Sequence, residues 1–273
     1  TGIFFFLIAI FFYLSWESKK QFNIINKELF LTIFFMSLTV YTRQIFALVF
    51  FYLLFEFFIR MKTKTFIKTC FLIFLFSLPG FGYIYFWPKI LQATFDYKLY
   101  NTLLINSSII SFYLIPFFLI LEKFKIKKML FNNQSFFILI ISSAIVVICA
   151  IFFDYNFRMG GGFFIKLSIL LFNNLSLFFL TSLIGLYLLC VLSLKNKMNI
   201  LLSTIILFSI SAWIIFQKYF EPMFILLLFF FYRTNLTKSF LKNKLNICLF
   251  HIYFIVYLFS AIVNDMLQLT KNI

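Results

Sequence analysis

The sequence predicts an all-α fold, a polytopic transmembrane helical bundle, and three observations lead to it. Apolar residues make up 64% of the 273-residue chain, and 48 of its residues are phenylalanines. The mean hydropathy is +1.05. A chain of this composition has more apolar surface than a single water-soluble core can bury. Lysine-rich segments interrupt the apolar runs. We therefore expect about nine or ten membrane segments, some of them short or broken, in one transmembrane domain over residues 1–273.

The apolar runs mark the expected helices, because about 20 helical residues cross the hydrocarbon core and shorter runs pair as hairpins or lie in the interface. In chain order the runs are 2–16, 29–42, 45–59, 67–87, 103–121, 135–153, 163–194, 199–216, 222–232 and 247–264. The long run from residue 163 carries Lys166, Asn173 and Asn174 in its first half. This pattern predicts an interfacial or broken helix, followed by a span near 176–194.

The basic residues orient these helices. The loops 17–28, 60–68, 122–130, 195–198 and 233–246 hold 17 of the 24 lysines and arginines, and the positive-inside tendency predicts that they face the cytoplasm. The apolar runs supply an even number of crossings between each pair of successive basic loops. The formal net charge of +16 therefore suits orientation against anionic lipid. We expect no binding of nucleic acid.

Arg43 and Gln44 separate two apolar runs that are each too short for a comfortable upright span. The pair therefore predicts a broken helix or hairpin turn near the outer surface. A guanidinium there can bind two oxygens of a phosphate, and the neighbouring carboxamide can hold a hydroxyl. The alternative is an arginine that only extends to the membrane interface.

A second polar group, "QKYFEP", concentrates Gln217, Lys218, Tyr219 and Glu221 directly before Pro222. We expect the next helix to begin here, with proline in its first turn. A lysine beside a carboxylate suits the binding of a phosphate and a sugar hydroxyl. The alternative is an ion pair that caps two spans.

A third group joins Asp154, Arg158 and three successive glycines at 160–162. Glycines let a backbone approach a ligand closely, although the GK[ST] ending of a phosphate-binding loop is missing. A flexible lid and a plain loop are both compatible with this pattern. The segment 96–98 is a weaker candidate, because a charged outer loop needs no special role.

Two further polar residues lie in apolar segments. Glu56 is expected to pair with Arg60 one helical turn later, which is a structural role. His251 is the only histidine, and without a second imidazole or a nearby carboxylate it is a poor metal ligand and a poor catalytic base. No metal site is predicted, and a requirement for a divalent metal is left open.

The segment "LTVYTRQIFALVFFYLLFEFF" (38–58) resembles the Arg-Gln segment of integral-membrane glycosyltransferases of the GT-C superfamily. The likeness is closest to the dolichyl-phosphoglucose α-1,2-glucosyltransferases and their bacterial relatives. In that family an aromatic pair followed by proline occurs near the C-terminus. Tyr219, Phe220 and Pro222 resemble it, with Lys218 where the family more often has arginine.

The resemblance implies a membrane glycosyltransferase that moves a sugar from a polyprenyl-phosphate donor to a lipid-linked or cell-surface glycan acceptor. Its expected partners are membrane lipid, the donor and the acceptor. The expected location is the inner or plasma membrane of a bacterium with an AT-rich genome, with the polar loops on the exoplasmic, periplasmic side. A surface-polysaccharide polymerase or ligase, and a lipid-linked-sugar flippase or transporter, are alternatives.

The resemblance also implies roles for particular residues. The residues expected to bind the donor or the acceptor are Arg43, Gln44, Lys218, Tyr219 and, in reserve, Arg158. Glu221 and Asp154 are fallback bases, because the family places its principal acidic residue in the first exoplasmic loop. The chain begins TGIFFF, without methionine or a charged leading segment. We therefore expect an N-terminally truncated fragment that lacks the first span and that loop.

Overall fold

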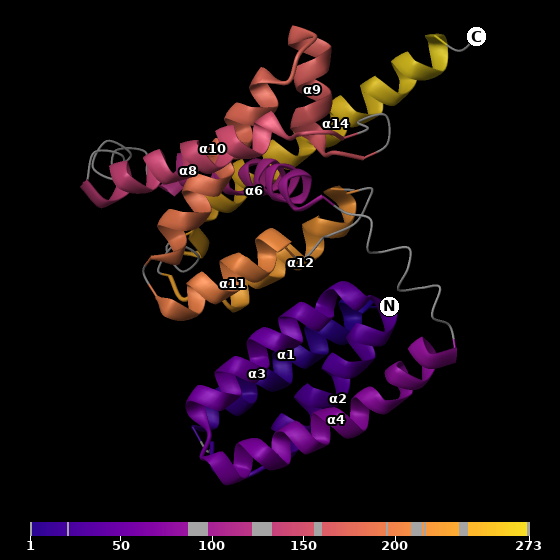
Figure 1. Ribbon diagram of the computed structural model, residues 1–273, viewed down its shortest axis with the longest axis vertical. Helices are drawn as coiled ribbons and strands as arrows, with labels where there is room; N and C mark the ends of the chain where they lie inside the picture. The colour runs from indigo at the N-terminus through magenta and orange to yellow at the C-terminus, as the bar shows by residue number, and fades with distance from the viewer. Residues whose placement is uncertain are drawn as a thin grey trace.

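The helices of the computed structural model fall into two groups (Figure 1). It describes residues 2–20, 22–86, 98–121, 133–155, 160–194, 196–208, 215, 217–234 and 240–271. The side chains of 84, 121, 218–222, 260–261 and 263–271 lie outside this description. All regular structure in the described residues is helical, so the predicted all-α fold is confirmed.

The first group, indigo to purple in Figure 1, contains four α-helices and one short 3₁₀ turn. In chain order they are α1 (Gly2–Lys19), α2 (Lys27–Thr42), η1 (Gln44–Phe46), α3 (Ala47–Arg60) and α4 (Thr63–Phe86). The sequence places the break between α2 and α3 at Arg43 and Gln44, and the structure confirms it. Asn26 caps the N-terminus of α2: its side-chain oxygen accepts a hydrogen bond of 3.0 Å from the backbone N–H of Leu29.

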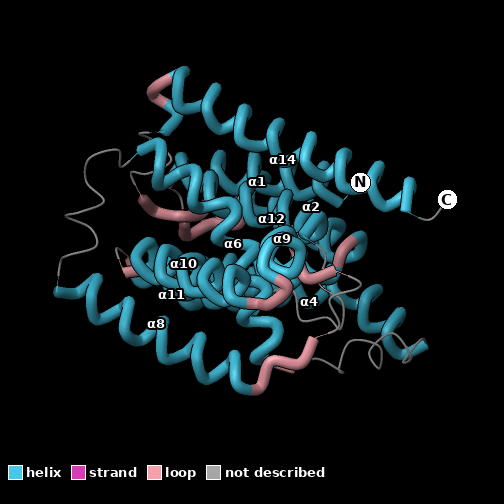
Figure 2. Tube along the Cα trace, turned by 90° about the horizontal axis from the view of Figure 1, so that it is seen from above, coloured by secondary structure: helices cyan, strands magenta, loops and turns pink. Residues whose placement is uncertain are grey.

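The second group holds the remaining helices. They are α6 (Leu99–Leu121), α8 (Asn133–Ile151), α9 (Phe163–Phe172), α10 (Ser176–Ser193), α11 (Lys197–Phe208), α12 (Gln217–Phe230) and α14 (Lys244–Lys271). In the view of Figure 2, α8 and α14 lie on opposite flanks, with α6 and α10 between them. The central pair is thus shielded by other helices of its own group.

The protein is a multi-pass membrane protein. Within the described residues, five helices are long and apolar enough to cross a membrane: α1, α4, α6, α8 and α10. Their outward faces carry large apolar side chains such as Phe71, Phe74 and Ile148, which are 52–62% exposed and suit contact with lipid. Shorter apolar helices, including α9 and α11, accompany them.

The break predicted in the run from residue 163 is confirmed at the junction of α9 and α10. Asn173 ends α9 in the left-handed conformation, with φ 52°, which asparagine tolerates better than most residues. The side-chain oxygen of Asn174 then accepts the backbone N–H of Ser176 at 3.0 Å, where α10 begins. Two asparagines therefore end one helix and start the next.

The expected start of α12 was wrong. The helix begins at Gln217, so Pro222 is its sixth residue and lies beyond the first turn. Only the first four N–H groups of a helix lack an intrahelical partner, so a proline at the sixth position removes one intrahelical hydrogen bond. The side chain of Gln217 makes hydrogen bonds that hold the helix start at this earlier residue, and they are described below.

Small residues bring α6 and α10 into close contact. A Cβ atom on Gly185 of α10 would overlap the backbone carbonyl of Ser107 in α6 and lie 2.9 Å from the backbone nitrogen of Ser111. Ser182 donates to the carbonyl of Leu104 at 2.9 Å. Between membrane helices, such close packing and interhelical hydrogen bonds replace the hydrophobic driving force that water supplies elsewhere. Glycine is therefore required at position 185.

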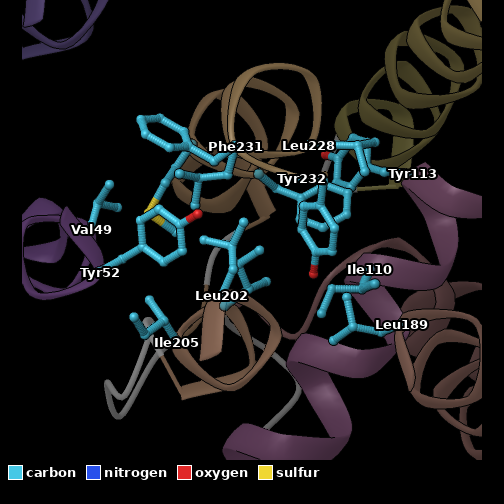
Figure 3. Close-up of a cluster of buried hydrophobic side chains, with 14 of the residues drawn as sticks. Val49, Tyr52, Ile110, Tyr113, Leu189, Leu202, Ile205, Leu228, Phe231 and Tyr232 are labelled. Atoms are coloured by element: carbon cyan, nitrogen blue, oxygen red, sulfur yellow. The ribbon is translucent and has the colours of Figure 1, made fainter. Parts of the chain in front are cut away.

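The two helix groups meet along a buried cluster, drawn in Figure 3, that we call the seam. On one side Val49 and Tyr52 project from α3 toward Leu202 and Ile205 of α11 and toward Phe231. The rings of Tyr52 and Phe231 have their centroids 5.6 Å apart. All five side chains are at most 8% exposed, so the seam is a continuous part of the core.

Candidate functional site

The described parts of four lysine-rich loops (17–28, 60–68, 195–198 and 233–246) gather at one end of the molecule, which we call the basic end. Thr65 donates a hydrogen bond of 2.9 Å to the carbonyl of Asn23, and this bond joins the first two basic loops. The backbone N–H of Arg233 donates to the side-chain oxygen of Asn199 at 2.9 Å, beside the fourth loop. The third loop, 122–130, lies outside the described residues. A shared end for the other loops agrees with the even number of crossings.

A charged group that we call the Glu56 cluster lies at this end. The Glu56 side chain is 2% exposed, and its Oε1 accepts from Arg60 at 2.6 Å and also from Arg233. Arg60 donates in addition to Glu17 at 2.5 Å. The predicted pair of Glu56 and Arg60 is confirmed. Arg233, 177 residues further along the chain, is the partner that sequence reasoning missed.

The Glu56 cluster joins the two helix groups. Glu17, Glu56 and Arg60 belong to α1 and α3, whereas Arg233 follows α12. A carboxylate this deeply buried is tolerated only with paired positive charge, because its transfer out of water costs several kcal/mol. Arg60 and Arg233 supply that positive charge to Glu56. The ion pair of Glu56 and Arg233 therefore links the two helix groups at the basic end of the seam.

Arg43 and Gln44 lie about one helix length, ~24 Å, from the basic end, because α2 runs 16 residues away from its basic loop. Arg43 is exposed and its backbone is extended, with φ −150° and ψ 108°. Its N–H donates to the carbonyl of Thr39 at 2.9 Å, and its carbonyl accepts from Phe46 at 3.1 Å. A Cβ on Gly2 would lie 3.6 Å from the Arg43 Cγ, so the pair sits beside the first turn of α1.

In the second helix group, Asp154 is tied to the start of α6. Its carboxylate, 78% exposed, pairs with Lys98 at 2.5 Å. Its backbone is held on both sides by Asn101, which donates to the carbonyl at 2.5 Å and accepts the N–H at 3.2 Å. The hydrogen bond to Asp154 raises the pKa of Lys98. The side chain expected as a fallback base is thus an exposed partner of a lysine.

The three glycines adopt positive φ values of 80°, 82° and 85°, which favour glycine strongly. The N–H of Gly161 donates to the carbonyl of Ile215 at 2.8 Å, and the N–H of Ile215 donates to the Tyr155 hydroxyl at 3.1 Å. Burial raises the pKa of Tyr155, so its hydroxyl stays protonated. In the described residues the glycines therefore serve a close approach between two loops.

Gln217 completes this set of contacts. Its side chain is buried, its Nε2 donates to the Tyr113 hydroxyl at 3.1 Å, and its Oε1 accepts the N–H of Phe163 at 2.9 Å. Both ends of the carboxamide are therefore engaged. The hydrogen bonds join three of the polar segments as one unit, which we call the polar platform: Lys98, Asn101, Asp154, Tyr155, Gly161, Ile215 and Gln217.

The remaining predicted residues are placed as follows. Lys218, Tyr219 and Glu221 follow Gln217 in α12, and their side chains lie outside the description, as does Arg158 entirely. The structure brings Asp154 into the polar platform and places Arg43 and Gln44 in the other helix group. A convergence of Arg43, Lys218 and Arg158 on one phosphate therefore stays a prediction.

Sequence reasoning missed Asn101, Tyr113 and Tyr155, which hold the polar platform together. The available signal was weak, since each is one polar or amphipathic residue at the edge of, or inside, an apolar run. Among the described residues, no group of three or more His, Cys, Asp or Glu side chains is arranged to hold a metal ion.

Comparisons of the chain with protein-family models, with curated proteins and with solved structures found no match. The fold and the two polar regions described above therefore stand on the chain's own residues. In the part of the chain that the structure describes, they belong to an all-α, multi-pass membrane protein.

Proposed function

We propose that the protein is an integral-membrane glycosyltransferase. It transfers a sugar from a polyprenyl-phosphate donor to a lipid-linked or cell-surface glycan, on the exoplasmic side of the membrane. The observation that carries this proposal is the exposed Arg43-Gln44 pair at a helix break, one helix length away from the basic end. Cationic and amide side chains at that depth suit a phosphate that is anchored to a lipid tail.

The chemistry is a single displacement. The acceptor hydroxyl oxygen attacks the anomeric carbon while the bond from that carbon to the phosphate oxygen breaks. The bonding electron pair leaves with the polyprenyl phosphate, and the hydroxyl proton passes to a carboxylate. Cations stabilise the phosphate, because negative charge develops there in the transition state.

The phosphate ligands in this proposal are Arg43 and Lys218, with Arg158 in reserve. Gln44 and Tyr219 orient hydroxyl groups of the sugar or of the acceptor. Glu221 and Asp154 are the candidate bases within this chain. For Asp154 to act as the base, its carboxylate has to release Lys98, the contact that it makes at 2.5 Å.

The test uses membranes that contain the protein expressed from its complete reading frame. Labelled polyprenyl-phosphate sugars are supplied with lipid-linked acceptors, and both glycan labelling and released polyprenyl phosphate are measured. We expect Arg43→Ala and Lys218→Ala to abolish transfer without loss of membrane insertion. Arg43→Lys keeps the charge but loses the two-pronged contact, so it should retain part of the activity.

The matched control is Lys64→Ala, which removes an exposed cation at the basic end and should leave transfer unchanged. Full activity in both alanine variants would remove the site assignment. Uptake of the sugar lipid into vesicles without release of polyprenyl phosphate would instead indicate a transporter.

A further inference from the structure

The start of α12 is fixed by one buried side chain. Gln217 is 8% exposed, and its carboxamide meets a donor and an acceptor on two different elements. The Tyr113 hydroxyl of α6 accepts from Nε2 at 3.1 Å, and Oε1 accepts the N–H of Phe163, the first residue of α9, at 2.9 Å. The helix start is therefore held to both elements at once.

The partner groups are themselves held firmly. Tyr113 is fully buried, and its ring stacks on Phe254 of α14 with a centroid separation of 5.9 Å. The other partner follows the glycines directly. A Cβ on Gly162 would lie 3.0 Å from Ile109 and 3.7 Å from the Gln217 Oε1, so the loop packs closely on α6 and Gln217, and its φ of +85° favours glycine.

A second attachment lies two residues earlier in the chain. The backbone of Ile215 donates to Tyr155 and accepts from Gly161. The chain that enters α12 is thus attached at 215 and at 217 to the same glycine-containing loop. Lys218 follows directly, so the position of its backbone depends on these attachments.

From this arrangement we propose that Gln217 is a positioning residue, which sets the first turn of α12 and with it Lys218 for binding a lipid-linked phosphate. The inference rests on the proposed function and adds to it a residue that does not touch the substrate. Displacements of about 1 Å at a binding group can reduce activity a hundredfold. Substitution of a residue that fixes the backbone beside such a group is therefore expected to weaken ligand binding.

The carboxamide can be altered in two distinct ways. Gln217→Ala removes both hydrogen bonds. Gln217→Glu keeps the shape, because a carboxylate accepts from Phe163 and the Tyr113 hydroxyl can turn to donate. It also adds a negative charge next to Lys218 in the chain, and that charge opposes an anionic ligand. Gln217→Ala therefore tests the loss of the positioning contacts, and Gln217→Glu tests the effect of an added negative charge beside Lys218.

The experiment measures acylation of individual lysines by an amine-reactive reagent, followed by mass spectrometry, with increasing undecaprenyl phosphate in detergent. In the wild-type protein, the lipid phosphate should protect Lys218 and leave Lys64 reactive. In Gln217→Ala and in Gln217→Glu, half-maximal protection should require about tenfold more lipid phosphate. Gln217→Glu should also lower the melting temperature, because its carboxylate is buried against neutral groups, the Tyr113 hydroxyl and the Phe163 N–H.

The matched control is Gln134→Ala, which changes an exposed glutamine at the start of α8. In this variant undecaprenyl phosphate should protect Lys218 as in the wild-type protein. If Gln217→Ala fails to fold, Tyr113→Phe serves instead, because it deletes only the hydroxyl that Gln217 contacts, and weaker protection of Lys218 is again expected. Wild-type protection in folded Gln217→Ala and Tyr113→Phe overturns the positioning role alone. An unprotected Lys218 in the wild-type protein overturns the phosphate site as well.

Discussion

The basic end and the polar platform both join segments that are distant in sequence, but they do so with different forces. At the basic end a buried carboxylate of α3 pairs with Arg60 of the same helix and, across the seam, with Arg233. In the polar platform the buried bonds are made by backbone groups, hydroxyls and the carboxamides of Asn101 and Gln217, and the ion pair of Lys98 and Asp154 stays exposed. An ion pair therefore links the two helix groups in addition to the apolar seam, while neutral bonds order the loops within one of them.

This difference has an energetic consequence. A buried charge that loses its partner costs several kcal/mol, whereas a typical neutral hydrogen bond contributes about 1 kcal/mol. A single substitution in the Glu56 cluster should therefore cost several kcal/mol in the free energy of unfolding. A single substitution in the polar platform should cost less. Four measurements on the protein in detergent or nanodiscs test this comparison.

The largest effect is expected for Glu56→Ala. The substitution leaves Arg60 and Arg233 without their shared carboxylate at the seam, and we expect a loss of about 3–5 kcal/mol in the free energy of unfolding. Chemical denaturation measures it. The control is Glu17→Gln, at the more exposed edge of the same cluster, with a much smaller loss. Equal losses for the two variants would show that burial does not govern the cluster.

Gly161→Ala tests the platform. The residue has φ +82°, and a Cβ there would lie 2.7 Å from the Ile165 Cγ2. We expect a loss of about 1–3 kcal/mol from backbone strain and crowding. Gly82→Ala is the matched control, because a Cβ at that helical position meets nothing within 4 Å. Alanine there should be neutral or stabilising by up to about 1 kcal/mol, so only Gly161→Ala should destabilise the protein.

Thr65→Val returns to the basic end but removes a neutral bond, the one from the hydroxyl to the Asn23 carbonyl. The expected loss is about 1 kcal/mol. Thr204→Val, which removes an exposed bond within one helix, should change stability by less than about 0.5 kcal/mol. A loss for Thr65→Val as large as that for Glu56→Ala would contradict the distinction between charged and neutral contacts.

The smallest effect concerns Lys98. Because the hydrogen bond to Asp154 raises its pKa, the folded protein holds the lysine proton more tightly than the unfolded chain. The contribution of this ion pair to stability is therefore complete below the ordinary pKa of lysine, about 10.4. It disappears as the pH rises through the pKa of Lys98 in the folded protein. The melting temperature of the wild type should exceed that of Lys98→Gln slightly at pH 8. The two should converge in strong alkali and in high salt.

The helices themselves were predictable, because their signals are local. The apolar runs, the two asparagines between α9 and α10, and the Arg43-Gln44 break each mark a feature within a few residues of where it occurs. The pair of Glu56 and Arg60 was predictable for the same reason, since residues four apart share one helix face.

The tertiary pairings were not predictable from one sequence. Arg233 meets Glu56 across 177 residues, and Gln217 meets Tyr113 across 104. Hydrophobic periodicity gives the face of a helix but not its neighbour. The start of α12 was placed too late for a related reason. Proline suggested a first turn, while the bonds of Gln217, which lie outside that local pattern, favour an earlier one.

The distance along the chain between Glu56 and Arg233 also has a consequence for synthesis. A ribosome adds about 5–20 residues per second. With a separation of 177 residues, Arg233 is therefore synthesised about 10–35 s after Glu56. Arg60, four residues away, emerges almost at once and can neutralise the carboxylate while the first four helices are being inserted. The nearer arginine thus protects the nascent chain, and the later one joins the halves of the finished protein.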